Sequence, residues 1–370
     1  MVSVLDLITR MIEWRASDLH ITVNSPPMFR VDGGLRPFDN HPLTPEEAQA
    51  IAYSVMKEEQ KKKFEDFDLD KERGRQVDFS FGIRHQLPDG RPFEARFRAN
   101  VFMQRANTAM VLRHIPTEIR GFEDLGVPRI LADFCDRPRG LILVTGPTGS
   151  GKSTTLAAMI DKINIERAEH ILTIEDPIEF VHRHKKCIVN QREVYSDTAS
   201  FGSALKVALR QDPDVVLLGE MRDKETVGIG LQIAETGHLT FATLHTNSAP
   251  QTINRVIDMF EQGERDAVRA QLAFVLEGVV CQQLIPKIGG GRVCACEILN
   301  VTPAIRSLIR DDKLHQIQGI MEVSQKYGMQ TLNMDLAKLV IQRKITREDA
   351  MMYSGDNEQL EKFISGNFRL

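Results

Sequence analysis

The sequence predicts an α/β protein with a doubly wound, mostly parallel sheet, preceded by a smaller mixed domain. From Gly140 onward, short and continuous apolar runs occur, which is typical of strands buried on both faces. Helical patterns separate these runs, and strands that alternate with helices favour a parallel sheet. The predicted strands of this part are residues 141–144, 171–174, 214–218 and 238–244.

The first third of the chain has a different pattern, which predicts a small mixed domain. Apolar residues recur at helical spacing between Val4 and Ile12. A second helix is expected after Thr44, because Pro45 suits the first turn and Glu47 completes a capping box. Short extended segments bounded by turn residues surround these helices. The predicted strands are residues 20–23, 28–31, 77–81 and 91–101.

The pattern breaks between His114 and Gly126, where Ile-Pro-Thr and Gly-Phe interrupt the periodicity. We therefore expect an N-terminal domain over residues 1–116 and a core over residues 117–370. Within this core, residues from about 302 to 370 are expected to form a helical C-terminal region.

The composition excludes several classes of protein. The net charge of −4 argues against a dedicated nucleic-acid binder, which usually carries a basic excess. The five cysteines are scattered and odd in number, so a disulfide framework is not expected. Cys294 and Cys296 are expected to share one face of a strand rather than hold a metal. No export signal is visible and no uncharged apolar run approaches about 20 residues, so we expect a cytoplasmic protein.

Residues 146–153 match the phosphate-loop pattern G-x-x-x-x-G-K-[ST], between a predicted buried strand and a predicted helix. Glycines allow backbone N–H groups to surround an anion, and the helix directs its positive end to the same point. We expect Lys152 to reach the β- and γ-phosphates of ATP, and Ser153 to bind Mg²⁺. The predicted phosphate-binding residues are Gly146, Pro147, Thr148, Gly149, Ser150, Gly151, Lys152, Ser153 and Thr154.

Hydrolysis also needs carboxylates, and two strands are followed by them. Strand 214–218 leads to Glu220, which we assign as the Walker B acid close to Mg²⁺. Strand 171–174 leads to Glu175, Asp176 and Glu179, one of which is either the general base or part of a polar turn that caps a helix.

Two histidines, His238 and His245, frame another strand. Lone histidines are more often structural than catalytic. Because they lie on opposite faces or ends of the strand, these two need not act together.

These motifs together resemble the secretion-superfamily ATPases, in the family's order of Walker A, Asp box, Walker B and His box. The further segments Ala16–His20, Val189–Val194 and Ala208–Asp214 extend the resemblance over nearly the whole chain. The resemblance implies a RecA-like P-loop ATPase core and a PAS-like α+β N-terminal domain. It also implies a homo-hexamer that uses ATP and Mg²⁺.

The resemblance also implies roles for individual residues. Glu179 becomes the general base, Glu220 lies near Mg²⁺, and His238 and His245 couple the nucleotide pocket to neighbouring subunits. Arg98 and Arg113 in the N-terminal domain are expected to supply positive charge to the phosphates. The alternative for these two arginines is that they pair with surface acids. The short linker over residues 115–121 is the expected hinge between the domains.

Within this family, the chain resembles the motors that retract type IV pili. It shows neither an extra N-terminal domain nor a four-cysteine zinc module. Residues 304–311 resemble a C-terminal signature of retraction motors, although Ser307 and Asp311 replace the common Asn and Glu. The implied partners are the inner-membrane platform protein and a paralogous retraction ATPase, at the cytoplasmic face of the inner membrane.

Other functions remain open at this stage. An accessory retraction ATPase, or an assembly or type II secretion ATPase, would share the chemistry. A nucleic-acid translocase would need a basic stripe rich in aromatic residues, whereas aromatic residues make up only 6% of the chain. A nucleotide-gated binding module would lack the catalytic carboxylates, and Glu179 and Glu220 are both present.

Overall fold

The computed structural model describes residues 2–31, 33–66, 75–115 and 118–366. Contacts divide the chain into two compact units, Met1–Thr117 and Glu118–Leu370. The centre of the expected hinge, Pro116 and Thr117, lies outside the described residues.

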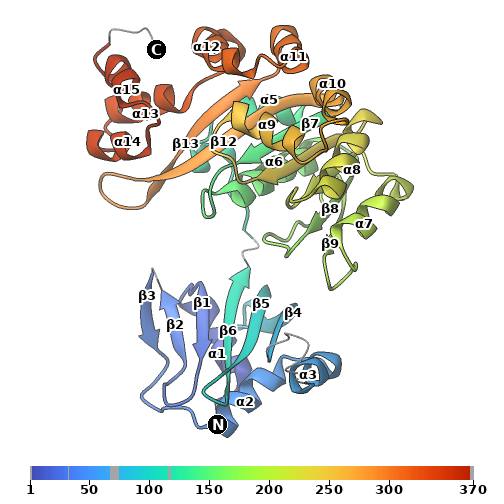
Figure 1. The fold of residues 1–370 in the computed structure, drawn as a ribbon. Coiled ribbons are helices and arrows are strands. Elements are labelled where there is room, and N and C mark those ends of the chain that lie inside the picture. Colours follow the sequence, from blue (N-terminus) through green and yellow to red (C-terminus); the bar gives the residue numbers. More distant parts are fainter. Residues whose placement is uncertain (1, 32, 67–74, 116–117, 367–370) are drawn as a thin grey trace. The chain divides into compact units, whose positions relative to one another are not determined.

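The first unit is an antiparallel sheet with the strand order β3-β2-β1-β6-β5-β4 (Figure 1). Its core forms because alternate strand residues, such as Leu19 and Phe97, pack against apolar faces of the helices, such as that of Ile8 and Met11. Thr44 and Glu47 form the expected capping box. The predicted mixed α+β fold of this unit is confirmed. Its elements are α1 (Val4–Glu13), β1 (Asp18–Ile21), β2 (Met28–Val31), β3 (Gly34–Pro37), α2 (Pro45–Ser54), α3 (Glu58–Glu65), β4 (Gln76–Gln86), β5 (Pro92–Gln104) and β6 (Asn107–Ile115).

The second unit is built on a mostly parallel sheet with the strand order β13-β12-β7-β11-β10-β8-β9. Only the pairing of β12 with β13 is antiparallel among the described residues of this sheet. The predicted doubly wound, mostly parallel sheet is therefore confirmed. Its strands are β7 (Gly140–Thr145), β8 (His170–Glu175), β9 (Ile188–Glu193), β10 (Val215–Leu218), β11 (Leu239–Leu244), β12 (Leu276–Pro286) and β13 (Arg292–Asn300).

Helices cover both faces of this sheet (Figure 1). Successive residues of β7 point to opposite sides: Ile142 and Val144 join the core beneath α5 and α6, whereas Leu141 and Leu143 join the core beneath α7 to α11. Most strand residues that enter these two cores are apolar, which explains why the strand sequences are nearly continuous apolar runs. The helices are α4 (Phe122–Leu125), α5 (Ile130–Cys135), α6 (Lys152–Glu166), α7 (Phe201–Ala208), α8 (Lys224–Glu235), α9 (Ala249–Asp258), α10 (Arg265–Val275) and α11 (Pro303–Arg310).

The C-terminal region is helical, and part of it has a core of its own. Apolar residues of α13 to α15, such as Leu336 and Leu360, pack together with Ile285 of β12 and Ala295 of β13. Cys294 and Cys296 share one face of β13 as expected, with their sulfur atoms 3.5 Å apart. The helices are α12 (Ile317–Val323), α13 (Leu332–Ile341), α14 (Arg347–Tyr353) and α15 (Asn357–Ile364).

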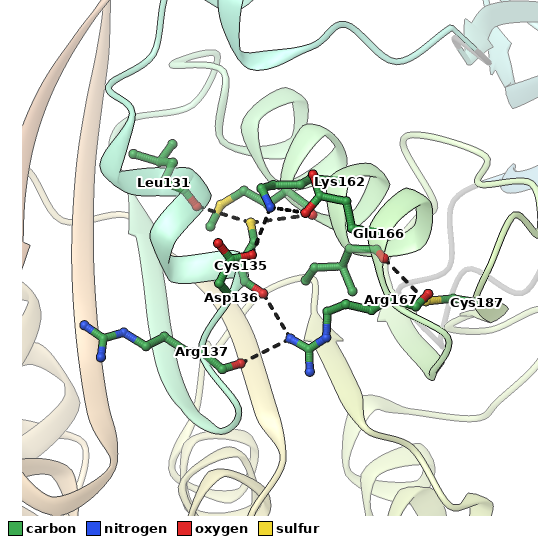
Figure 2. Close-up of polar contacts among 10 residues, drawn as sticks. Leu131, Cys135, Asp136, Arg137, Lys162, Glu166, Arg167 and Cys187 are labelled. Atoms are coloured by element: carbon green, nitrogen blue, oxygen red, sulfur yellow. Dashed lines mark hydrogen bonds and ion pairs between the residues drawn. The ribbon is translucent and has the colours of Figure 1, made fainter.

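The end of α6 farthest from the phosphate loop is fixed by polar contacts (Figure 2). Lys162 Nζ donates to Asp136 Oδ1 at 2.9 Å. Arg167 Nη1 donates to the carbonyl oxygens of Cys135 and Arg137, at 3.0 and 3.2 Å. These bonds satisfy carbonyl groups at the end of α5, which have no partner within their own helix. They hold α5 against α6 and so fix the helix whose first turn carries the phosphate loop.

No helix in the described part of the chain combines the length and apolar character that crossing a membrane requires.

Candidate nucleotide site

The phosphate loop connects the carboxyl end of β7 to the first turn of α6. Gly146, Gly149 and Gly151 have positive φ values of 136°, 78° and 91°, which side chains rarely permit. A Cβ atom at Gly146 would also overlap the carbonyl oxygen of Gln282 on β12. The glycines are therefore required both by the conformation of the loop and by its close packing on β12. Such a loop directs backbone N–H groups and the N-terminus of α6 toward one point, which suits a phosphate.

Lys152 is the first residue of α6 and is 9% exposed. Its Nζ donates to the carbonyl oxygens of Gly146 at 2.8 Å and Pro147 at 3.1 Å. Burial lowers the pKa of this amine, while Glu220 and Glu179 act in the opposite direction. Both carboxylates follow strands, β10 and β8, whose carboxyl ends lie at the same edge of the parallel sheet as the end of β7, where the phosphate loop begins.

Gln282 of β12 supports the loop from beneath. It is 1% exposed, and its Nε2 donates to Thr155 Oγ1 on α6 at 2.8 Å. Its carbonyl oxygen also approaches Gly146. Gln282 therefore contacts both the start of the loop and the first turn of the helix after it. Sequence reasoning missed this residue because β12 lies about 130 residues after the loop along the chain.

Glu220 lies just past the end of β10, between two basic groups. Its Oε2 is 2.7 Å from Arg222 Nη2, and its Oε1 is 3.0 Å from His245 Nε2. Burial opposes ionisation of this carboxyl, but the bonds to Arg222 and His245 prevail, so its pKa lies below its ordinary value. Gly219 precedes it because a Cβ there would lie 3.1 Å from Glu175 Cα on the neighbouring strand.

Glu179 lies in the segment that follows β8. Together with Ser153, Glu175 and Thr243, it lines a cavity of about 30 Å³, which has room for a water molecule. The structure therefore brings Ser153 and Glu179 to one cavity. This cavity lies at the carboxyl ends of the parallel strands, where Lys152 and Glu220 also lie. Oxygen ligands such as the hydroxyl of Ser153 and the carboxylate of Glu220 suit Mg²⁺. This ion needs few protein ligands when phosphates and water complete its coordination shell.

His238 and His245 lie at opposite ends of β11. His238 directly precedes the strand, and its Nδ1 lies 3.0 Å from the carbonyl oxygen of Ile233. His245 follows the strand beside Glu220. A strand of this length separates them by about 23 Å. Within one chain, only His245 therefore lies with the predicted phosphate and metal residues.

Arg98 and Arg113 belong to the first unit, where they are opposite one another on β5 and β6. Arg113 Nε donates to Asp18 Oδ1 at 2.8 Å, and Arg98 Nη2 lies 3.9 Å from Asp78 Oδ1. Burial raises the pKa of Asp18, but the bonds from Arg113 and Ser17 outweigh this and hold it below its ordinary value. Within this unit, each arginine thus has an acidic partner, of which Asp78 is exposed and Asp18 is buried.

Comparison with known proteins identifies relatives over nearly the whole chain. Residues 3–290 match the family described as type II/IV secretion system protein. The chain is 51% identical over 335 residues to the type IV pilus retraction ATPase PilT of Pseudomonas aeruginosa, which covers 90% of this chain and 93% of that protein. It is 40% identical over 359 residues to the type IV pilus ATPase PilU of the same organism, which covers 97% of this chain and 90% of that protein.

Solved structures agree with this similarity. A crystal structure of the pilus retraction motor PilT with bound ADP has a TM-score of 0.88 and 52% sequence identity, and the match covers 98% of this chain and all of that one. The ATPase DotB of Legionella pneumophila shares the fold at 24% identity, with a TM-score of 0.77 and 95% of each chain covered.

Proposed function

Because the chain belongs to the type II/IV secretion system protein family, we propose that it is the ATP-hydrolysing motor that retracts type IV pili. The resemblance to secretion ATPases that the sequence motifs predict is confirmed. The observation that carries the proposal is the similarity to PilT, which at 51% exceeds the 40% identity to PilU. The convergence of a phosphate loop and two carboxylate strand ends supplies the chemistry that such a motor requires.

ATP binds with its phosphates in the loop, which residues 146–154 form. The N-terminus of α6 and the loop N–H groups neutralise the β- and γ-phosphates. The ammonium group of Lys152, which contacts the loop carbonyls at Gly146 and Pro147, is within reach of the same point. Mg²⁺, held by Ser153 and Glu220, supplies charge neutralisation to the phosphate oxygens when it is bound.

Glu179 acts as the general base that orients and deprotonates the attacking water. Its support is the cavity that it shares with Ser153, which is large enough for a water molecule. Glu220 stays ionised because its pKa is below the ordinary value, as a metal-binding carboxylate must be. His245 holds Glu220 in place through its Nε2.

Arg98 and Arg113 of the first unit deliver positive charge to the nucleotide phosphates. Arg113 is 66% exposed in its side chain although it is bound to Asp18, so an anion can reach this side chain. Asp18 is only 7% exposed in its side chain, so exchanging it for a phosphate leaves a buried carboxylate without this charged partner, and the bonds to the phosphate must offset that cost.

The assembly and its location follow from the same proposal. Six copies form a ring in which His238 faces a neighbouring subunit, since it lies at the strand end away from the phosphate loop of its own chain. The ring acts on the inner-membrane platform protein of the pilus machine, together with a paralogous retraction ATPase. It works in the cytoplasm at the inner face of that membrane and does not bind nucleic acid.

Counting surface pili and measuring surface motility in source cells that lack this protein tests the proposal. Many pili together with no motility are expected, since pilus assembly continues without retraction. Cells without pili would instead identify an assembly or secretion ATPase. Strong stimulation of the purified protein's ATPase by DNA would identify a translocase.

A further inference from the structure

The side-chain amide of Gln191, on β9, forms hydrogen bonds to residues that precede Glu179 and to residues that follow it. Its Nε2 donates to the carbonyl oxygen of Phe180 at 2.8 Å. Its Oε1 accepts the backbone N–H of His182, also at 2.8 Å. The same Nε2 lies 3.2 Å from Glu175 Oε1, at the end of β8. One side chain therefore joins the start and the end of the segment that carries Glu179.

Two carboxylates hold the same segment at its other peptide groups. Glu193 Oε2 accepts the backbone N–H of Ile178 at 3.2 Å. Glu175 accepts the backbone N–H of Glu179 itself and the hydroxyl of Thr173. Gln191 and Glu193 are two residues apart on β9, so their side chains leave the same face of the strand. Side chains on this face of β9 thus bind the backbone of residues 178–182 and fix its path.

The position of Glu179 depends on these backbone contacts because Glu179 is exposed. Packing fixes a buried side chain, but it does little for an exposed one. The position of the Glu179 carboxylate is consequently determined by the backbone on either side of it. Ile178 and His182, on either side of Glu179, are 3% and 8% exposed, so packing fixes the two ends of this segment.

We propose that Gln191 is a positioning residue for ATP hydrolysis, which holds Glu179 where its carboxylate meets the attacking water. The inference rests on the proposed role of Glu179 as general base. An amide is required because the site needs a donor for Phe180 and an acceptor for His182 from one group. A glutamate at this position keeps the acceptor but loses both donors, and a leucine loses all three bonds.

Steady-state ATPase assays on full-length Gln191→Leu and Gln191→Glu test the proposal. We expect kcat to fall about tenfold or more, because small displacements of a catalytic group cost that much. The KM for ATP and the affinity for ADP should change by less than about twofold, since ground-state binding uses the loop of residues 146–154. Asn190→Leu and Asn190→Asp are matched controls, because the adjacent Asn190 bonds to His170 instead of this segment.

A double-mutant comparison separates positioning from general loss of structure. Adding Gln191→Leu to Glu179→Gln should cause little further loss of kcat, because residues that act as a unit are not additive. A further tenfold loss in the double variant, or unchanged kcat in both single Gln191 variants, would overturn the inference while leaving Glu179 as the base. Full turnover in Glu179→Gln would overturn the proposed base and the inference with it. Thermal unfolding identifies folded variants, and Gln191→Glu serves if Gln191→Leu does not fold.

Discussion

The imidazole of His245 lies 3.0 Å from the carboxylate of Glu220, across the ends of the neighbouring parallel strands β11 and β10. Each residue directly or almost directly follows its strand, so the register of the sheet brings them together. Thr243 adds a second link, because its Oγ1 donates to the carbonyl oxygen of Gly219 at 2.5 Å. The pair of His245 and Glu220 thus joins the carboxyl ends of two strands, at the edge of the sheet where the phosphate loop begins.

Replacing His245 by alanine should lower kcat about tenfold, because Glu220 then loses one of its two basic partners and its fixed orientation. The affinity for ADP should remain within about threefold of the original value, because His245 does not contact the phosphate loop. Steady-state kinetics and ADP titration measure the two quantities. The control is His315→Ala, which removes an exposed histidine in the C-terminal region. Unchanged kcat in His245→Ala would show that Arg222 alone maintains Glu220.

Replacing Gly146 by alanine should abolish nucleotide binding and lower the free energy of unfolding by about 2–4 kcal/mol. The new Cβ would overlap the carbonyl oxygen of Gln282, and φ is 136° at this position. Thermal unfolding with and without ADP measures both effects. Gly319→Ala, in α12, is the control, since Gly319 is not among the described glycines with positive φ and an added Cβ there meets no described side chain within 4 Å. ADP-dependent stabilisation that persists in Gly146→Ala would contradict this account of the loop.

Removing the ammonium group with Lys152→Ala should reduce ATP turnover at least about 100-fold, because no other loop side chain supplies positive charge at the phosphates. Adding a chelator such as EDTA should have a comparable effect on the unaltered protein if Mg²⁺ is required. The assay is phosphate release under saturating ATP, with circular dichroism to verify the fold. Turnover that survives Lys152→Ala would exclude residues 146–153 as the catalytic phosphate loop.

The parts that could be predicted from sequence are those in which local residues determine structure. The phosphate loop is one contiguous segment, and its glycines, Lys152 and Ser153 occupy fixed positions relative to β7 and α6. The strand ends after residues 174 and 218 could be predicted for the same reason, since parallel strands present their carboxyl ends at one edge.

The supporting residues could not be predicted, because their partners are distant in sequence. Gln282 reaches Thr155 across 127 positions, and its role depends on β12 lying beside β7. Gln191 could have been noticed because alternation places it with Glu193, but nothing local shows that the segment after β8 folds back onto β9. The separation of His238 from His245, by contrast, could be predicted, because the two histidines frame a single strand.

The half-buried side chain of Glu175 should make the stability of the protein depend on pH. Burial raises its pKa to about 7 against an ordinary value near 4.5, despite the hydrogen bonds from Thr173 and Gln191. Between these pH values the folded protein holds a proton that the unfolded chain has released, so this contribution to stability falls as pH rises and is lost above about 7. Buried His182, whose pKa is lowered to about 4 from 6.5, acts in the opposite direction over much of this range and masks the effect.

Glu175→Gln should separate these two contributions, because it removes the titrating carboxyl and leaves His182 in place. The stability of the variant relative to the original protein should therefore rise by about 2–3 kcal/mol between pH 4.5 and 7. Urea unfolding at a series of pH values measures this difference directly, and comparing the two proteins cancels every group that they share. Asp266→Asn, an exchange at an exposed carboxylate paired with Arg269, provides the control. A difference that stays constant with pH would show that Glu175 has the same pKa in the folded and the unfolded protein, so that its hydrogen bonds cancel the effect of its burial.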